Sequence, residues 1–333
     1  MPLEARHSVT EAPIPDTPRA RTEFGSSLEA LAQWQAAMSR IRAFELVVAK
    51  ARHEDRLPGL LHLSMGSEAT AVGVIAELSE EDRVYSSHRA HGHFLAAGVD
   101  QADLFAELAG RDSGLCRGRG GSMHLMAERV VMASGIVGGT LPIALGHSLT
   151  LARGTVAIAF FGDGAVQTGT FHETLNLAAL WDAPVLFVCE NNGYAEFSRR
   201  EEHSRVERVA SYGAVYGIGA LEVDCTDVEA VAVAARVLLD EVREGRGPRL
   251  LECRVTRLRP HYEGDLRVQA AGVDPMTRAL GALVARGASR EALLEQHRRD
   301  VADAEATLQS VLASAPLPDP TEDESFVFAR PLP

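Results

Sequence analysis

The sequence predicts an α/β fold built on a mostly parallel sheet that is flanked by helices. Two apolar runs of strand length, residues 155–161 and 185–189, show no alternation of polar and apolar side chains, which indicates strands covered on both faces. Between them, residues 170–181 carry apolar side chains at helical spacing, and Pro184 ends that pattern. A strand, a helix and a second strand in this order form a crossover unit, so both strands run parallel.

Polar residues follow both of these strands at their carboxyl ends. Because parallel strands end at the same edge of a sheet, where open α/β sheets bind ligands, Asp163 and Asn192 are expected to lie together. Their oxygens suit Mg²⁺, which usually shares its coordination with a diphosphate. Gly164 and Ala165 are expected to open a helix whose free N–H groups favour phosphate oxygens. The segment around Asp163 and the segment around Asn192 are each typical of an ordinary turn. The two segments together, each after an apolar strand, favour a cofactor site.

The composition restricts the class of protein. A length of 333 residues suffices for one large α/β domain with helical additions, or for two domains. The formal charge of −13, from 33 basic and 46 acidic residues, argues against a nucleic-acid-binding surface. Four cysteines without close pairs and an N-terminus without a signal-peptide core indicate a cytoplasmic protein. No apolar run approaches the length that spans a membrane.

The N-terminal part is expected to begin with a mobile arm over residues 1–25, where prolines alternate with mixed charges. Ser26 and Ser27 can then cap a long helix. One face of that helix is marked by five apolar side chains: Leu31, Trp34, Met38, Ile41 and Val48. A loop over residues 59–73 is predicted to enter an alanine-rich helix, and residues 83–87 are predicted to form a short strand.

Three histidines and an arginine follow this short strand within six residues. His88, His91 and His93 could be zinc ligands, but no cysteine or carboxylate lies at a suitable spacing. They could also form a solvated turn. A guanidinium beside imidazoles at a strand end, as at Arg89, equally suits a diphosphate next to an acid–base site. The residues alone leave these alternatives open.

Two glycine-rich segments come next. Residues 117–124 form a basic loop whose backbone N–H groups can approach an anion, and a mobile surface loop is the alternative. Residues 135–139 are predicted to start a helix of small residues that runs to about Leu151. Small side chains in that helix would let a flat ligand or a neighbouring helix come close.

The C-terminal half is predicted to complete the sheet. We expect a charged surface loop over 199–208, a helix over 212–219, a strand near 221–223, an amphipathic helix over 228–243 and a strand over 249–255. The last strand leads to a loop that carries His261, which therefore faces the same edge as Asp163.

Residues 276–315 are predicted to be helical, with an extended, proline-rich tail after them. Leu294, Val301 and Leu308 lie seven residues apart in this helix. Such a narrow apolar seam is typical of a contact within the chain rather than with a partner.

With these segments in order, the chain from about residue 28 resembles the alpha subunit of the thiamine diphosphate-dependent first component of 2-oxo acid and acetoin dehydrogenase complexes. The Gly-Asp-Gly of residues 162–164, followed by a helix and the asparagines of 191–192, looks like the thiamine diphosphate and magnesium motif of this family. Residues 87–93, 190–196 and 261–265 resemble the acetoin branch most. The Arg-x-His-Gly within the first of these is also similar to the pyruvate branch and unlike the branched-chain branch.

The resemblance implies a thiamine diphosphate-binding fold in one domain, residues 26–333, with added N- and C-terminal helices. It implies Asp163, Asn192 and the backbone carbonyl of Tyr194 as magnesium ligands. The other cofactor contacts that it implies are His88, Arg89, Gly135, Val137, Gly164, Ala165, Arg257 and His261. His91 and His261 would line the reacting thiazolium carbon and assist proton transfer, or acyl transfer to lipoamide.

The resemblance also implies the function. The expected enzyme cleaves acetoin, or a small 2-oxo acid, and transfers the two-carbon acyl group to a lipoyl acyltransferase. A pyruvate dehydrogenase (acetyl-transferring) alpha subunit is the alternative within the class. A beta subunit is expected as partner in an α₂β₂ heterotetramer, with the cofactor across the interface.

Two hypotheses belong to other classes. A non-catalytic subunit that binds cofactor only for assembly would not need the intact Asp163, Asn192, His91 and His261. A magnesium-dependent protein that binds phosphate esters would leave the histidine loops unexplained.

Overall fold

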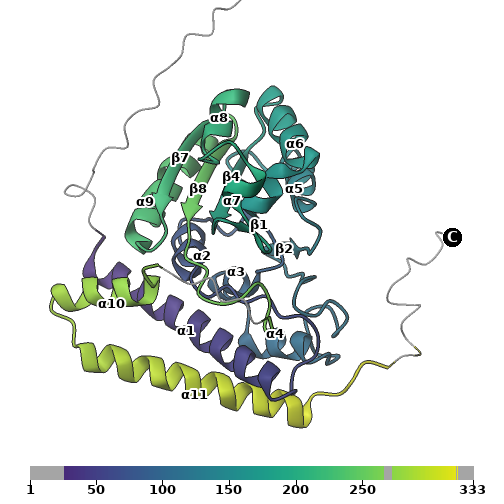
Figure 1. Ribbon diagram of the computed structural model, residues 1–333, viewed down its shortest axis with the longest axis vertical. Coiled ribbons are helices and arrows are strands. Elements are labelled where there is room, and N and C mark those ends of the chain that lie inside the picture. Colours follow the sequence, from purple (N-terminus) through teal and green to yellow (C-terminus); the bar gives the residue numbers. More distant parts are fainter. Residues whose placement is uncertain (1–25, 266–271, 320, 322–333) are drawn as a thin grey trace, which may run out of the picture.

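The computed structural model describes residues 26–265, 272–319 and 321. Within them, six strands form one parallel sheet of order β2-β1-β3-β4-β8-β7 (Figure 1). The strands are β1 (Arg83–Ser86), β2 (Val130–Ala133), β3 (Ala157–Gly162), β4 (Val185–Asn191), β7 (Gly219–Asp224) and β8 (Arg249–Arg254). The predicted parallel sheet is thereby confirmed. The predicted arm and the end of the predicted tail lie outside the described residues, so the division into an arm and one domain stays a prediction.

Helices cover both faces of the sheet because the strand side chains alternate between two apolar clusters. On β3, Ile158 and Phe160 pack on the face that α2 and α9 cover, whereas Ala159 and Phe161 pack on the face that α5 and α6 cover. The helices of these two layers are α2 (Glu68–Ile75), α5 (Thr140–Ser148), α6 (Gly169–Leu180), α8 (Ser211–Tyr216) and α9 (Val228–Arg243). Burial on both faces explains why these strands are uniformly apolar in the sequence.

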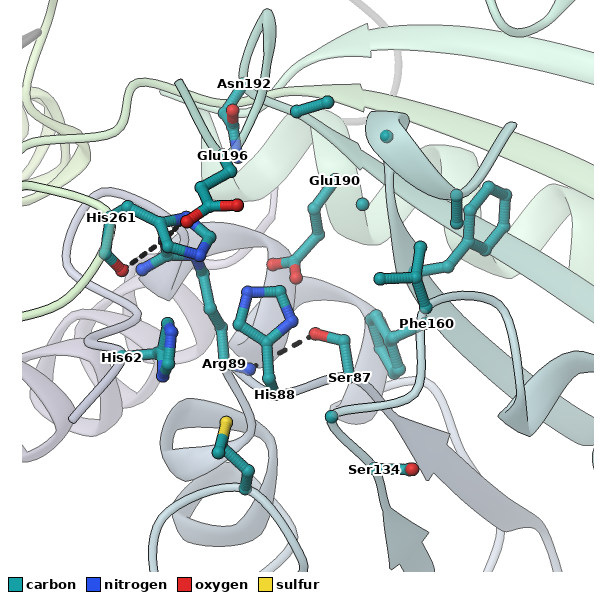
Figure 2. Close-up of a pocket in the computed structure, with 18 of the residues that line it drawn as sticks. His62, Ser87, His88, Arg89, Ser134, Phe160, Glu190, Asn192, Glu196 and His261 are labelled. Carbon is teal, nitrogen blue, oxygen red and sulfur yellow. Dashed lines mark hydrogen bonds between the residues drawn. The ribbon is translucent and has the colours of Figure 1, made fainter. Parts of the chain in front are cut away.

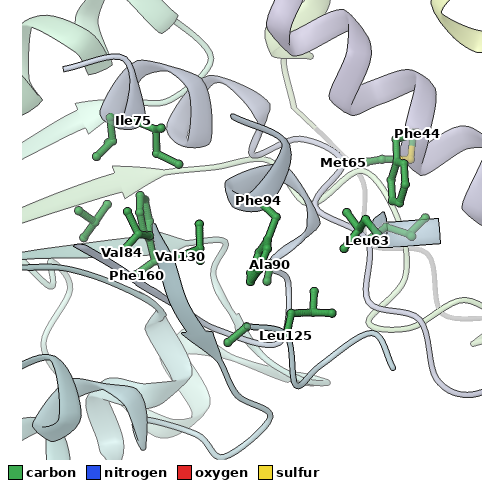
Figure 3. Close-up of a cluster of buried hydrophobic side chains, with 14 of the residues drawn as sticks. Phe44, Leu63, Met65, Ile75, Val84, Ala90, Phe94, Leu125, Val130 and Phe160 are labelled. Carbon is green, nitrogen blue, oxygen red and sulfur yellow. The ribbon is translucent and has the colours of Figure 1, made fainter. Parts of the chain in front are cut away.

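Figure 3 shows part of the larger cluster, in which side chains from loops join those of the sheet. Val84 and Phe160 of the strands share this cluster with Phe44 of the N-terminal helix α1 (Leu28–His53) and with Leu63 and Met65 of the loop before α2. Apolar burial therefore fixes the loop of residues 61–65, and this also fixes the positions of the polar residues in that loop.

Three helices pack together along one end of the sheet, at the bottom of Figure 1: α1 (Leu28–His53), α10 (Pro275–Ala285) and α11 (Arg290–Ser314). The Ser27 hydroxyl accepts a hydrogen bond of 3.1 Å from the N–H of Ala30, which confirms the predicted cap of α1. In α11, Leu308 is fully buried whereas Leu294 is 37% exposed. The seam is thus a contact within the chain, as predicted, but only over the C-terminal half of the helix.

The remaining elements are short. They are α3 (His91–Ala96), α4 (Gln101–Leu108), α7 (Arg200–His203), a 3₁₀ turn (Asp163–Gln167) and the two-stranded antiparallel pair β5 (Tyr194–Ala195) and β6 (Ser198–Arg199). Among the described residues, no helix combines the length and the apolar content that crossing a membrane requires.

Two predicted helices begin or end differently. The helix predicted over 276–315 is two helices, because Gly287 between them has φ +97°, a conformation that favours glycine, and Ser289 caps α11. Gly164 and Ala165 do not open α6. They lie in the 3₁₀ turn, and α6 starts after Thr168, whose hydroxyl accepts a hydrogen bond from the N–H of Phe171.

Two further segments, one predicted to start a helix and one predicted to be a loop, also differ from expectation. Residues 135–139 precede α5 as a turn and are not its first residues. The charged segment 199–208 is not a surface loop throughout, because Arg200 starts α7 and its side chain is buried, with its guanidinium bonded to the carbonyls of Val206 and Glu207.

The glycine-rich loop folds around a carboxylate of its own chain. Glu107 of α4 is fully buried and accepts four backbone hydrogen bonds, from the N–H groups of Cys116 (2.7 Å), Gly118 (2.9 Å), Gly120 (2.6 Å) and Gly121 (3.0 Å). A side chain at position 120 would place its Cβ 1.8 Å from the carbonyl oxygen of His124, so only glycine fits. The backbone N–H groups of this loop therefore do bind an anion, as the glycines indicated, but the anion is the Glu107 carboxylate of the same chain.

We predict that Leu308→Ala lowers the free energy of unfolding by about 2–5 kcal/mol, because it opens a cavity where α11 packs on the core. Leu294→Ala, at a position two heptads earlier on the same helix, is the matched control and should cost less than about 1 kcal/mol. Urea denaturation of the purified chain measures both. Equal losses of unfolding free energy in the two variants would contradict the finding that only the C-terminal half of the apolar seam is buried.

Candidate active site

A cavity of about 530 Å³ opens where the strands of the sheet end, within the usual size range of small-molecule sites (Figure 2). Its walls come from the segments that follow β1, β3, β4 and β8 and from the loops before α2 and α5. The predicted site residues that line it are His88, Arg89, Gly135, Val137, Gly164, Ala165, Asn192, Tyr194, Arg257 and His261. The structure therefore brings these positions together from the ends of five strands, β1, β2, β3, β4 and β8, as the parallel topology requires.

The guanidinium of Arg89 joins two loops beside the cavity. It donates hydrogen bonds to the carbonyl oxygens of Leu63 (2.8 Å) and His261 (2.7 Å), and it lies 3.2 Å from Nδ1 of His261. Burial, with Arg257 nearby, lowers the pKa of Arg89 to about 10, so it remains a cation at pH 7. Burial also lowers the pKa of Arg257, which donates to the carbonyl of Glu196 at 3.1 Å. Two buried cations on one wall favour a strongly anionic ligand.

Asp163 lies immediately beside this wall, at the end of β3, and is fully buried. Its Oδ1 accepts a hydrogen bond of 3.2 Å from the N–H of Asn192. Its Oδ2 has no hydrogen-bond donor in the described part of the chain, and the nearest guanidinium nitrogen, from Arg200, is 3.9 Å away. Burial raises the pKa of Asp163 to about 6.

A buried carboxylate oxygen without a donor fits a bound cation. Asn192 holds its amide oxygen in the same loop, where it accepts a hydrogen bond of 3.1 Å from the N–H of Tyr194. A carboxylate, an amide oxygen and a backbone carbonyl are hard oxygen ligands of the kind that Mg²⁺ takes together with a diphosphate. The residues present therefore fit that ion and that group.

Three imidazoles converge on the cavity: His62, His88 and His261. Burial, and then the charge of Arg89, lowers the pKa of His62 to about 3 and the pKa of His88 well below its usual value. Both rings are therefore neutral at pH 7. Nδ1 of His62 and Nε2 of His88 have no hydrogen-bond partner among the described residues, so both offer a lone pair or a proton to a ligand.

His91 does not line the cavity, so the structure does not bring it together with the other predicted site residues. Its ring is fully buried, with Nδ1 3.1 Å from Oε2 of Glu45 and Nε2 3.0 Å from Oγ of Ser122. The other oxygen of Glu45 accepts hydrogen bonds from the N–H (2.8 Å) and the hydroxyl (2.7 Å) of Ser64. His91 thus links the glycine-rich loop to the loop before α2.

The three histidines of the short motif do not form a zinc site, because their side chains face different partners. His93 stacks on Phe160 with ring centres 3.9 Å apart, and its Nδ1 lies 2.7 Å from Oγ of Ser86. Its Nε2 lies 3.7 Å from Oε1 of Glu190, a carboxylate that lines the cavity. Only His88 of the three reaches the cavity.

His62 and Glu190 are among the cavity residues that were not predicted from the sequence. His62 lies in a loop that follows no strand, so the strand-end argument could not select it. That loop runs against the end of β8: a Cβ at Gly66 would lie 1.7 Å from the carbonyl oxygen of Thr256. Long-range contacts of this kind, which no local pattern reveals, place His62 at the site. Glu190 had a local signal, since it directly precedes the paired asparagines.

Comparison with known proteins places these residues in a family context. Residues 36–297 match the family model described as dehydrogenase E1 component. The chain is 45% identical over 233 residues, 68% of this chain and 70% of the relative, to the alpha subunit of acetoin:2,6-dichlorophenolindophenol oxidoreductase from Bacillus subtilis. It is 43% identical over 241 residues (71% and 72%) to the protein of the same name from Cupriavidus necator. It is 39% identical over 261 residues (76% and 73%) to the pyruvate dehydrogenase E1 component subunit alpha of Zymomonas mobilis.

The lowered pKa of His62 predicts a pH dependence of stability. A folded-state pKa of about 3 lies below the value of 6.5 in the unfolded chain, so below pH 6.5 the unfolded chain binds more protons. This contribution to stability is complete above about pH 6.5 and is lost as the pH falls toward 3. Urea denaturation at pH 7 and pH 5 should show a smaller loss in His62→Gln than in the natural chain. The control His124→Gln removes an exposed imidazole and should keep the full loss; identical losses in all three proteins would contradict the assignment.

Proposed function

The chain belongs to the dehydrogenase E1 component family, and from this premise we propose that it is the alpha subunit of an acetoin dehydrogenase. The family implies thiamine diphosphate as the cofactor and an oxidoreductase activity. In the proposed reaction, acetoin is cleaved with release of acetaldehyde. The disulfide of a lipoyl acyltransferase then oxidises the remaining two-carbon fragment to an acyl group, is itself reduced, and carries that group as a thioester. The observation that carries this proposal is the meeting of a buried carboxylate, two buried guanidiniums and three imidazoles at one cavity. The two relatives named for acetoin support acetoin as the substrate.

Residues of this chain would hold the two ends of the cofactor. Arg89 and Arg257 would bind the diphosphate, together with the backbone at Gly164 and Ala165. At Gly164 a Cβ would meet the Cβ of Ala195 at 3.0 Å, so a larger residue would push the two loops apart. The backbone of Gly135 and Val137, which also line the cavity, would contact the aminopyrimidine. When bound, thiamine diphosphate supplies a carbon nucleophile and an electron sink.

Mg²⁺ is the proposed ion at Asp163. Its ligands would be Oδ2 of Asp163, the amide oxygen of Asn192 and the carbonyl oxygen of Tyr194. The cation would replace the missing donor at Oδ2 and would favour the charged form of a carboxyl group whose pKa burial has raised. Asp163 would in this way couple metal binding to diphosphate binding.

Proton transfer at the substrate is assigned to the imidazoles that line the cavity. His88 and His62 are neutral and have unpaired ring nitrogens, so they can accept or return a proton at those atoms. His261 is held by Arg89 through its carbonyl and its Nδ1. His91 acts indirectly in this proposal, because it positions the loop of Ser122 from outside the cavity.

A beta subunit is the proposed partner, which the alpha-subunit names of the relatives imply. Ile136 and Val137 line the cavity and are still 69% and 57% exposed, so the wall that they form is incomplete in this chain alone. Further exposed apolar side chains lie on the adjacent helices α5 and α6 (Ile143 and Leu180) and directly after their last residues (Leu149 and Trp181). Such a surface is typical of a protein interface. We propose an α₂β₂ assembly that closes the cavity; the cytoplasmic location stays a prediction.

Pyruvate is the second candidate substrate, since the Zymomonas mobilis relative is named for pyruvate dehydrogenase. Both candidates place a two-carbon unit in the same cavity. A purely structural, cofactor-binding subunit is disfavoured, because assembly alone needs no neutral imidazoles with unpaired nitrogens at the site.

We predict that Asp163→Asn abolishes Mg²⁺-dependent binding of thiamine diphosphate by the assembled α₂β₂ protein, because it removes the charged ligand. The matched control is Asp182→Asn, an exposed aspartate just before β4 at the opposite edge of the sheet. Isothermal titration calorimetry measures both affinities. An unchanged affinity in Asp163→Asn would exclude this residue as a metal ligand.

The isolated chain should be inactive with Mg²⁺ and thiamine diphosphate, because its cavity wall is open where the partner docks. With the beta subunit added, acetoin should be oxidised by an artificial electron acceptor, and kcat/KM should be higher for acetoin than for 2-oxoisovalerate. Steady-state assays of the chain alone and of the two-chain mixture test both statements. Full turnover by the isolated chain would overturn the interface site, and a preference for 2-oxoisovalerate over acetoin and pyruvate would overturn the substrate assignment.

A further inference from the structure

The three imidazoles at the cavity are spaced like the ligands of a single metal ion. The ring centre of His62 lies 4.8 Å from that of His88 and 4.9 Å from that of His261, and the last two are 5.5 Å apart. With Zn–N bonds of about 2.0–2.1 Å and tetrahedral angles, the ring centres of three zinc-bound imidazoles lie about 5 Å apart. The packing of these rings thus already has the dimensions of such a site.

The nitrogen atoms are close to the required arrangement. All three offer a ring nitrogen within 4.8 Å of the others, whereas a tetrahedral site needs about 3.4 Å between ligand nitrogens. Side-chain rotations that move each nitrogen by roughly 1 Å would close this difference. Nδ1 of His62 and Nε2 of His88 lack hydrogen-bond partners in the described chain, so no existing bond at these atoms has to break.

We propose that His62, His88 and His261 form a second metal site, which takes a borderline-soft divalent cation such as Zn²⁺. Neutral imidazoles are the preferred ligands of Zn²⁺, Co²⁺ and Ni²⁺, whereas Mg²⁺ takes oxygen. The site is therefore chemically distinct from the oxygen ligands at Asp163. Three protein ligands leave the fourth position of the ion to water or to a group in the cavity.

Charge around the site decides how strongly it binds. Arg89 and Arg257 repel a dication, while the carboxylates of Glu190 and Glu196, which line the same cavity, attract it (Figure 2). Oε1 of Glu190 has no hydrogen-bond partner among the described residues and remains available to a metal-bound water. A bound diphosphate would neutralise the two arginines, so the site should bind Zn²⁺ more tightly once the diphosphate is in place.

Occupancy of this site blocks the reaction, a conclusion that rests on the proposed function. An ion held by His62 and His88 takes the lone pairs that proton transfer would use, and it fills the space beside them. Zn²⁺ should therefore inhibit the assembled enzyme reversibly, with full recovery after chelation.

Co²⁺ is the probe for the site, since tetrahedral Co²⁺ with nitrogen ligands absorbs visible light strongly and hydrated Co²⁺ does not. We expect the purified full chain, free of cofactor, to give these absorption bands with one equivalent of Co²⁺. Zn²⁺ should remove the bands, and Mg²⁺ in excess should leave them. An absence of bands, or their loss with Mg²⁺, would overturn the proposal.

Three separate variants identify the ligands. His62→Gln, His88→Gln and His261→Gln should each weaken Co²⁺ binding by more than about tenfold, since even the loss of an outer partner of a ligand costs about that much. The control is His172→Gln, whose imidazole lies on α6 at 2.8 Å from the Tyr216 hydroxyl and not at the cavity. Circular dichroism confirms that each variant is folded. Bands that survive in all three variants, or that vanish in His172→Gln, would overturn the assignment.

The metal site and the proposed function can fail separately. Co²⁺ bands without turnover of acetoin or pyruvate by the α₂β₂ assembly would overturn the function and support the metal site. Turnover without bands would overturn the metal site alone. Turnover that Zn²⁺ inhibits and a chelator restores, in the assembly whose alpha chain gives the bands, would support both.

Discussion

Four neighbouring strands, β1, β3, β4 and β8, run parallel, and everything at the cavity depends on this constraint. Their carboxyl ends open on one edge, so the segments that follow them meet although they are far apart in the chain. Arg89, Asp163, Asn192 and Arg257 each come from a different one of these segments. Burial of both sheet faces fixes the strands, and the fixed strands in turn hold charged groups at a place where few partners are available.

The cavity therefore holds charges that burial disfavours. Burial raises the pKa of Asp163 and lowers the pKa values of Arg89 and Arg257, and each shift means that the charged form is less stable here than in water. The proposed dication and diphosphate would supply the opposite charges. Binding of both should consequently raise the stability of the whole fold, because only the folded chain assembles these residues.

Elements whose side-chain pattern repeats along the chain were predicted from the sequence. The amphipathic spacing predicted the bounds of α9, and the apolar runs predicted β3 and β4. The site residues that directly follow strands were predicted because the ends of parallel strands meet at one edge of the sheet.

His62 could not be predicted in this way, since its position depends on contacts between its loop and the end of β8. His91 lies apart from His88 because α3 begins at His91 and its ring is buried. The break at Gly287 was hidden by apolar spacing that continues across it.

The buried carboxylate of Glu107 affects how readily proteases can cleave the loop that folds around it. Segments rich in arginine and glycine are usual targets of trypsin-like enzymes, which must pull the peptide bond after an arginine into an extended, unpaired conformation. Here the bonds after Arg117 and Arg119 are those whose N–H groups, on Gly118 and Gly120, donate to the buried carboxylate. Cleavage at either bond requires that two or more of these hydrogen bonds break first. The part of the surface that looks most digestible in the printed sequence is therefore protected without any ligand.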